Sequence, residues 1–145
     1  SSAATIPVTL KTVTDDLGVK KDVSSFVIPV GATINMDGTA IMQGLATMFI
    51  ASTAGVDLSM IEYLQIVLLA MVASIGAAAV PSAGTITLAL ILSSLGLPLD
   101  AIGLILAVDR ILDMIRTSVN VTGDSAIACI VADSENLLDK EVFNK

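Results

Sequence analysis

A group of charged and polar residues lies inside an otherwise apolar segment of this chain, which limits the folds open to it. The run DRILDMIRTSVNVTGDS occupies residues 109–125, with AIGLILAV before it and AIACIVA after it. If residues 101–132 form one helix, its length is about 48 Å, which exceeds the roughly 30 Å hydrocarbon core of a bilayer. At 100° per residue, six polar side chains share an arc of about 100°. We call them the polar stripe: Asp109, Asp113, Arg116, Thr117, Asn120 and Asp124.

The polar stripe is expected to face protein, water or a ligand instead of lipid. A charged side chain at the centre of a bilayer costs about 2.5 to 3.5 kcal/mol on insertion scales. Internal salt bridges that hold a helix bundle together are one interpretation. However, Arg110 and Arg116 do not balance three carboxylates, and Arg116 offers a planar fork of donors that suits a carboxylate. A site for small ions, with surplus negative charge for an external cation, is the sharper hypothesis.

The composition indicates a membrane protein. Hydrophobic residues make up 54% of the 145 residues and the mean hydropathy is +0.90, which is too apolar for an average soluble domain. The net charge of -7 argues against a nucleic-acid partner. With no histidine and only Cys129, the sequence offers no histidine-dependent triad, histidine zinc site, disulfide or cysteine metal cluster. We expect neither enzyme activity nor a cofactor.

The first half of the chain predicts two helical segments of different kinds. It begins with small polar residues and no initiator methionine, so we expect it to start inside a larger protein. Residues 1–19 predict a short helix that ends near Gly18. Residues 23–53 are long enough to span a membrane, but Pro29, Gly31 and the segment INMDGT interrupt them.

The segment INMDGT predicts a broken helix whose carbonyl groups and side chains bind an ion. The alternative is a kinked helix in which Asn35 and Asp37 are hydrogen-bonded internally. Residues 60–97 hold two apolar arms, IEYLQIVLLAMVAS and TITLALILSSLGL, around the tip IGAAAVPSAG. Each arm is about 20 Å long as a helix, too short to cross the hydrocarbon core, which favours a re-entrant helical hairpin. Two full spans with a tight turn are the alternative.

Loop charge predicts the orientation of the chain. Lysines lie before the broken helix and after the final helix, whereas loops 53–59 and 98–100 carry none. By the positive-inside rule, the first loop and the C-terminus are cytoplasmic. This orientation is the same for a re-entrant and for a spanning hairpin, so charge does not separate those alternatives.

Three motifs in this order resemble the glutamate transporter family, the dicarboxylate/amino acid:cation symporters. They are NMDGT in the broken helix, the Gly/Ala/Pro-rich hairpin tip, and D-x-x-x-D-x-x-R-T-x-x-N-V-x-G-D in the final helix. The first residues, SSAATIP, are similar to the second half of that family's first hairpin tip. The resemblance therefore implies that six helices and one hairpin arm precede this chain.

The resemblance implies an all-α membrane protein that forms part of an inverted-repeat transport domain, which moves as an elevator against a scaffold domain. Its parts would be the second arm of the first hairpin (1–19), a broken transmembrane helix (23–53), a re-entrant second hairpin (60–97), a long final helix (101–132) and a cytoplasmic tail (133–145). The scaffold domain, through which a homotrimer would form, is absent from this sequence. We expect a multi-pass protein of the plasma or inner membrane, in contact with lipid.

The resemblance also implies which residues bind substrate. Arg116 would hold the side-chain carboxylate of L-aspartate or L-glutamate, and Asp113 would bind the amino group. Side chains or backbone of six further residues would complete the pocket: Ser2, Thr39, Val80, Gly84, Thr117 and Asn120. Arg116 separates the chain from the neutral amino acid branch of the family, and Asp113 separates it from the dicarboxylate branch.

Sodium is the coupling ion that the resemblance implies. One site would combine the Asp124 carboxylate with carbonyl oxygens of Gly31, Asn35 and Asn120. A second site would use backbone carbonyls of Thr33, Ser74, Ile75 and Ala77, and a third would use Asp37 and Asn35 with residues outside this sequence.

The sequence therefore predicts a sodium-coupled symporter of acidic amino acids. The alternatives within transport are proton-coupled symport of the same substrates and symport of C4-dicarboxylates. An intramembrane aspartyl protease with Asp37 and Asp124 as its acid/base dyad is a remote alternative, because the G-x-G-D pattern of such enzymes is absent. A purely structural subunit of a helix bundle is the other.

Overall fold

The computed structural model describes residues 1–77 and 83–145 of the chain. The described residues contain helices and a single β-bridge but no strand, so the prediction of an all-α fold is confirmed. A π-helical turn (Thr12–Asp16) follows α1, and a short 3-10 helix (Leu99–Ala101) precedes α6. The α-helices are α1 (Ser2–Lys11), α2 (Lys21–Ile34), α3 (Asp37–Thr53), α4 (Met60–Ile75), α5 (Ala83–Ser94), α6 (Ile102–Leu106), α7 (Asp109–Ser134) and α8 (Lys140–Phe143).

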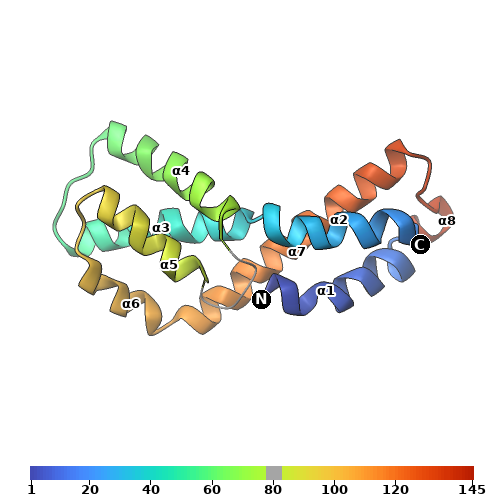
Figure 1. Ribbon diagram of the computed structural model, residues 1–145, viewed down its shortest axis with the longest axis horizontal. Helices are drawn as coiled ribbons and strands as arrows, with labels where there is room; N and C mark the ends of the chain where they lie inside the picture. The colour runs from blue at the N-terminus through green and yellow to red at the C-terminus, as the bar shows by residue number, and fades with distance from the viewer. Residues whose placement is uncertain (78–82) are drawn as a thin grey trace.

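The long helix α7 organises the rest of the molecule (Figure 1). α1 and α2 pack along its C-terminal half, α3 packs on its N-terminal half, and α4 and α5 pack on α3. An apolar core lies at each end. One joins α3, α5 and α6 through Ala46, Ile50, Ala51, Leu88, Leu92, Leu97 and Ile105. The other joins the end of the first helical segment to α2 and α7 through Val13, Val19, Val23, Ile28, Ala128 and Ala132. The polar stripe runs along α7 from its first residue, Asp109, to Asp124, between these two cores.

The segment predicted as a broken helix consists of α2 and α3, with an interruption at Asn35 and Met36. Both residues leave the helical conformation, with φ/ψ of -87°/89° and -118°/42°. Pro29 lies inside α2 and does not end it. The interruption begins six residues further on. Polar groups of α7 form hydrogen bonds there with backbone and side-chain groups that the helices leave without partners, as described below.

The two arms of the predicted second hairpin are α4 and α5, which contact each other. α4 begins with a capping box, in which Ser59 and Glu62 bond each other's backbone N–H groups, so its start is fixed by local sequence. Of the predicted tip, residues 75–84, positions 78–82 lie outside the described residues.

The final helix predicted over residues 101–132 differs in the structure. It is divided into α6 and α7, with a turn at Ala107 and Val108, and α7 extends to Ser134. The division places Asp109 in the first turn of α7, where the helix dipole favours an acidic group. No helix among the described residues combines the length and the sustained apolar character of a membrane-crossing helix.

The chain after α7 is tied back onto the loop before α2. Asn136 has a left-handed backbone (φ 58°), which reverses the chain. The Lys20 N–H then donates to the Leu137 carbonyl oxygen at 3.0 Å, and the Asp139 N–H donates to the Gly18 carbonyl oxygen at 2.8 Å. These bonds close the core at this end of the molecule and hold the start of α2 beside the end of α7.

Candidate functional site

All six residues of the polar stripe are buried, with exposed fractions between 1% and 8%. They lie in one continuous helix, α7, and the helical period brings them to one face. The stripe was predicted to face protein, water or a ligand instead of lipid, and in this structure it faces the neighbouring helices. Burying so many polar groups is unfavourable unless each finds partners, so the contacts of the stripe define the candidate site.

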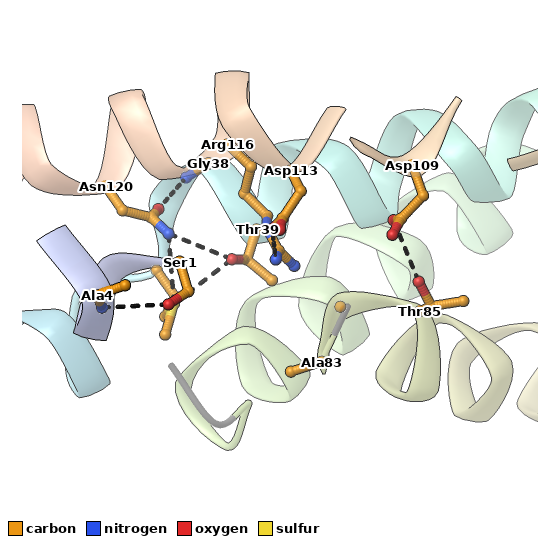
Figure 2. A network of polar contacts seen from close by, with 12 residues as sticks. Ser1, Ala4, Gly38, Thr39, Ala83, Thr85, Asp109, Asp113, Arg116 and Asn120 are labelled. Carbon is orange, nitrogen blue, oxygen red and sulfur yellow. Dashed lines mark hydrogen bonds and ion pairs between the residues drawn. The ribbon is translucent and has the colours of Figure 1, made fainter. Parts of the chain in front are cut away.

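Arg116 and Asp113 form an ion pair one turn apart on α7, and both side chains are buried. Figure 2 shows the two side chains next to each other. The guanidinium also lies directly against Gly84 in the first turn of α5, because a Cβ added to Gly84 would overlap Nη1 of Arg116. Only a residue without a side chain leaves room for the guanidinium there. The structure thus brings three predicted substrate residues together from two helices.

Asn120 binds the N-terminal turn of α3. Its Oδ1 accepts a hydrogen bond of 2.8 Å from the Gly38 N–H, one of the donors that a helix start leaves without an intrahelical partner. Its Nδ2 lies 3.4 Å from Thr39 Oγ1 and 3.4 Å from Met36 Sδ (Figure 2). A Cβ on Gly38 would overlap the Arg116 carbonyl oxygen, so the two helices are in backbone contact here. Asn120 therefore joins the interruption between α2 and α3 to the charged pair.

Asp124 lies one turn beyond Asn120 and is exposed by 1%. Its Oδ1 accepts a hydrogen bond of 2.9 Å from Asn35 Nδ2, and it also lies directly against Gly31 of α2. Its Oδ2 is buried and has no hydrogen-bond partner among the described residues. A buried carboxylate oxygen without a partner is costly unless a cation or a proton satisfies it. Asn35 Nδ2 also lies 3.4 Å from the Asn120 carbonyl oxygen, so the four residues predicted for this site lie together.

The other predicted site residues are placed as follows. Ser2 is buried at the start of α1, and Thr39 and Thr117 are buried beside the charged pair and Asn120. Val80 lies outside the described residues. Among the described residues, no group of three or more His, Cys, Asp or Glu side chains could hold a metal ion.

The residues predicted for the second and third cation sites are on neighbouring helices. Thr33 is exposed near the end of α2. Ser74 and Ile75 are the last residues of α4, which contacts α2, and Ala77 follows two residues after this helix ends. The Ser74 carbonyl oxygen accepts a 3.1 Å hydrogen bond from the Ala77 N–H. Asp37, the first residue of α3, is exposed.

Sequence reasoning missed two polar pairs that hold α5. Gln43 of α3 is fully buried and donates through Nε2 to Thr87 Oγ1, while its Oε1 has no partner among the described residues. Thr85 Oγ1 lies 3.4 Å from Asp109 Oδ1 (Figure 2). Gln43 could have been included from the sequence, because it follows Thr39 by four residues and so lies on the same face of the helix.

Comparisons with known proteins agree with the motifs. A model of the sodium:dicarboxylate symporter family matches residues 1–134. Excitatory amino acid transporter 1 of Homo sapiens is 49% identical over 145 residues, which are 100% of this chain and 26% of that protein. Excitatory amino acid transporter 2 of Mus musculus is 54% identical over 131 residues, 90% of this chain and 23% of that protein. An excitatory amino acid transporter of Caenorhabditis elegans is 53% identical over 131 residues, 90% of this chain and 26% of that protein.

The chain thus spans about a quarter of the length of the curated relatives it matches. The match covers the interruption between α2 and α3 and the whole polar stripe, which are the features that define the candidate site. The family resemblance predicted from the three motifs is confirmed, and the chain belongs to the sodium:dicarboxylate symporter family.

Proposed function

We propose that this chain is part of the transport core of a sodium-coupled symporter for acidic amino acids, aspartate or glutamate. The observation that carries the proposal is the buried Asp113–Arg116 pair, with the Gly84 backbone directly against the guanidinium. A positive and a negative group side by side match the two kinds of charge that an amino acid carries. The names of the relatives, excitatory amino acid transporters, support the same substrate class.

The substrate would exchange partners with this ion pair. Arg116 would bind the side-chain carboxylate of the substrate with its planar fork, and Asp113 would bind the ammonium group. Because each group already has an opposite charge beside it, the empty site stays neutralised until a molecule with both charges enters. A C4-dicarboxylate lacks the ammonium group and would leave Asp113 beside a second negative charge, which disfavours that alternative. Ser2, Thr39, Val80, Gly84, Thr117 and Asn120 would complete the pocket.

Sodium would be held first at Asp124. Its Oδ2, which has no partner among the described residues, would supply a hard, negative oxygen that suits this cation. The carbonyls of Gly31, Asn35 and Asn120 would supply the remaining ligands. Asn120 belongs both to this cation site and to the substrate pocket, so it would couple the two. The alternative coupling ion is the proton, because a proton on Oδ2 would also satisfy that oxygen.

The two further cation sites would involve the ends of other helices. Carbonyls of Thr33, Ser74, Ile75 and Ala77 would form the second site, so that an ion there would join α2 to the hairpin α4–α5. Asp37 and Asn35 would contribute to the third. Asp37 is exposed in this chain, so the remaining ligands of an ion at the third site would come from residues outside the sequence.

The proposal includes a placement in the membrane. α2 and α3 would form a broken transmembrane helix, α4 and α5 a re-entrant hairpin, and the C-terminus would be cytoplasmic. The molecule would move as an elevator against a scaffold domain that also forms a homotrimer, in the plasma or inner membrane. Large exposed apolar side chains on α3, α4 and α7, such as Leu45, Leu64 and Met114, support burial of this surface in lipid or against further parts of the protein.

Equilibrium binding to the purified full-length parent protein tests the proposal. We expect aspartate or glutamate to bind in sodium chloride, binding to be lost in choline chloride, and succinate and alanine to compete weakly. Asp113→Asn should reduce competition by aspartate more than competition by succinate, because only the amino acid uses that carboxylate. Equal affinities for aspartate and succinate in the unmodified protein would contradict the substrate assignment.

A further inference from the structure

The helix α5 is held at its start by two threonines that contact different helices. Its sequence is AGTITLALILSS, so Thr85 and Thr87 are the only polar side chains before the serines at its end. Thr87 accepts a hydrogen bond from Gln43 of α3, and Thr85 lies within hydrogen-bond distance of Asp109 of α7. Residues two apart on a helix point about 200° away from each other. The start of α5 is therefore tied on opposite sides.

The same turn of α5 contacts the charged pair of the candidate site. Thr87 Oγ1 donates to the Gly84 carbonyl oxygen at 3.0 Å, and Gly84 is the residue that lies against Nη1 of Arg116. A short chain of contacts therefore leads from Gln43 through Thr87 and Gly84 to Arg116. Gln43 is fully buried and Asp109 is 6% exposed, so water competes little for either bond.

Apolar packing alone does not fix which side of α5 meets Arg116. Leu88 and Leu92 anchor the helix in its core, but hydrophobic contact is non-directional. A rotation by one residue position, about 100°, would turn the Cβ of Ala83 or Thr85 toward the guanidinium, where only the space of a glycine is free. The hydrogen bonds of the two threonines are directional and select the orientation that presents Gly84.

We propose that Gln43 and Asp109 are positioning residues for Arg116, which act by orienting the first turn of α5 through Thr87 and Thr85. The role of Arg116 in this inference rests on the proposed function. Removal of the Thr87 hydroxyl takes the acceptor from the buried Gln43 Nε2, and removal of the Thr85 hydroxyl takes one contact from Asp109. Without these directional contacts α5 turns or moves, and the guanidinium loses its fixed neighbour. The consequence is weaker binding of the substrate carboxylate.

The test uses the full-length parent protein reconstituted in liposomes, with Thr85→Val and Thr87→Val, which keep the side-chain shape and remove the hydroxyl. We expect KM for aspartate to rise about fivefold in each variant, with the maximal rate changed by less than about twofold. Thr85→Ser and Thr87→Ser keep the hydroxyl and should restore KM. Ser94→Ala, at the exposed far end of the same helix, is the matched control and should leave KM unchanged.

A double-mutant cycle shows whether the effect passes through Arg116. Thr87→Val combined with Arg116→Lys should raise KM by less than the product of the single effects, because the planar guanidinium that α5 orients is already gone. Fully multiplicative effects, or serine variants that behave like the valine variants, would overturn the inference.

Hydrogen exchange of residues 83–92, followed by mass spectrometry in detergent, tests the same attachment without any transport. We expect faster exchange in the valine variants than in the serine variants and in Ser94→Ala. If the unmodified protein takes up no aspartate, the proposed function fails, and this measurement still decides the attachment of α5. Exchange that is the same in all variants would overturn the inference even where aspartate uptake is normal.

Discussion

The close contact between Gly31 and Asp124 predicts that a side chain at position 31 disturbs the candidate cation site. In Gly31→Ala, the added Cβ would overlap Oδ1 of Asp124 and would lie 2.9 Å from its carboxyl carbon. Ordinary contacts of this kind begin near 3.4 Å, so the carboxyl carbon must retreat by about half an ångström and Oδ1, which is closer, must retreat further. The 2.9 Å bond from Asn35 Nδ2 to this oxygen would be stretched or broken.

The expected change in the sodium requirement follows from the strength of the hydrogen bond between Asn35 and Asp124. A hydrogen bond to a charged group contributes about 1.5 to 3 kcal/mol. If the cation needs the carboxyl group in its present position, the variant should require about 10 to 100 times more sodium for half-maximal aspartate uptake. The assay is uptake by the full-length parent protein in liposomes at a series of sodium concentrations.

Gly44 provides the matched control for this prediction. It lies inside α3, and a Cβ added there meets none of the described residues within 4 Å. Gly44→Ala should leave the sodium dependence unchanged and raise stability by about 0.5 to 1 kcal/mol, as expected for a helix interior. If Gly31→Ala and Gly44→Ala show the same sodium dependence, the position of the Asp124 carboxyl group does not control sodium binding.

Three further predictions concern the charged pair, the start of α3 and the tie to the C-terminal segment. Arg116→Cys should weaken uptake of acidic amino acids and admit neutral ones, measured by competition with alanine and serine; unchanged aspartate selectivity would contradict its assignment. Asn120→Leu should lower the free energy of unfolding by about 1 to 3 kcal/mol, because it leaves the buried Gly38 N–H without an acceptor. Thermal unfolding measures this loss, and a melting temperature equal to that of the unmodified protein would exclude it. Gly18→Ala should destabilise more than Gly55→Ala, since both glycines have positive φ but only at Gly18 would a Cβ lie 2.6 Å from a backbone oxygen. Equal melting temperatures of these two variants would show that the contact at Gly18 is unimportant.

The polar stripe could be predicted from the sequence because helix geometry alone decides which residues share a face. Asp113 to Asp124 follow the helical period, and the cost of exposing them to an apolar environment predicts their burial. The interruption at Asn35 was predictable for a related reason, because helix-breaking and polar residues gather there. These are local properties of the chain.

The contacts between distant segments could not be predicted from residue patterns alone. The approach of Gly84 to Arg116 and of Gly31 to Asp124 depends on how α2, α5 and α7 pack, and the sequence carries no local mark of it. The division between α6 and α7 also escaped prediction, because neither glycine nor proline marks the turn at Ala107 and Val108. The turn places the buried Asp109 at the start of α7. This reason for the division becomes clear only once its contact with Thr85 of α5 is known.

Uptake of radiolabelled aspartate into liposomes that contain the full-length parent protein tests whether Asp124 serves a sodium-coupled transporter. We predict uptake that depends on an inward sodium gradient and that collapses in Asp124→Asn. Uptake driven by a proton gradient in the absence of sodium would contradict the assignment of Asp124 and the carbonyls around it to sodium.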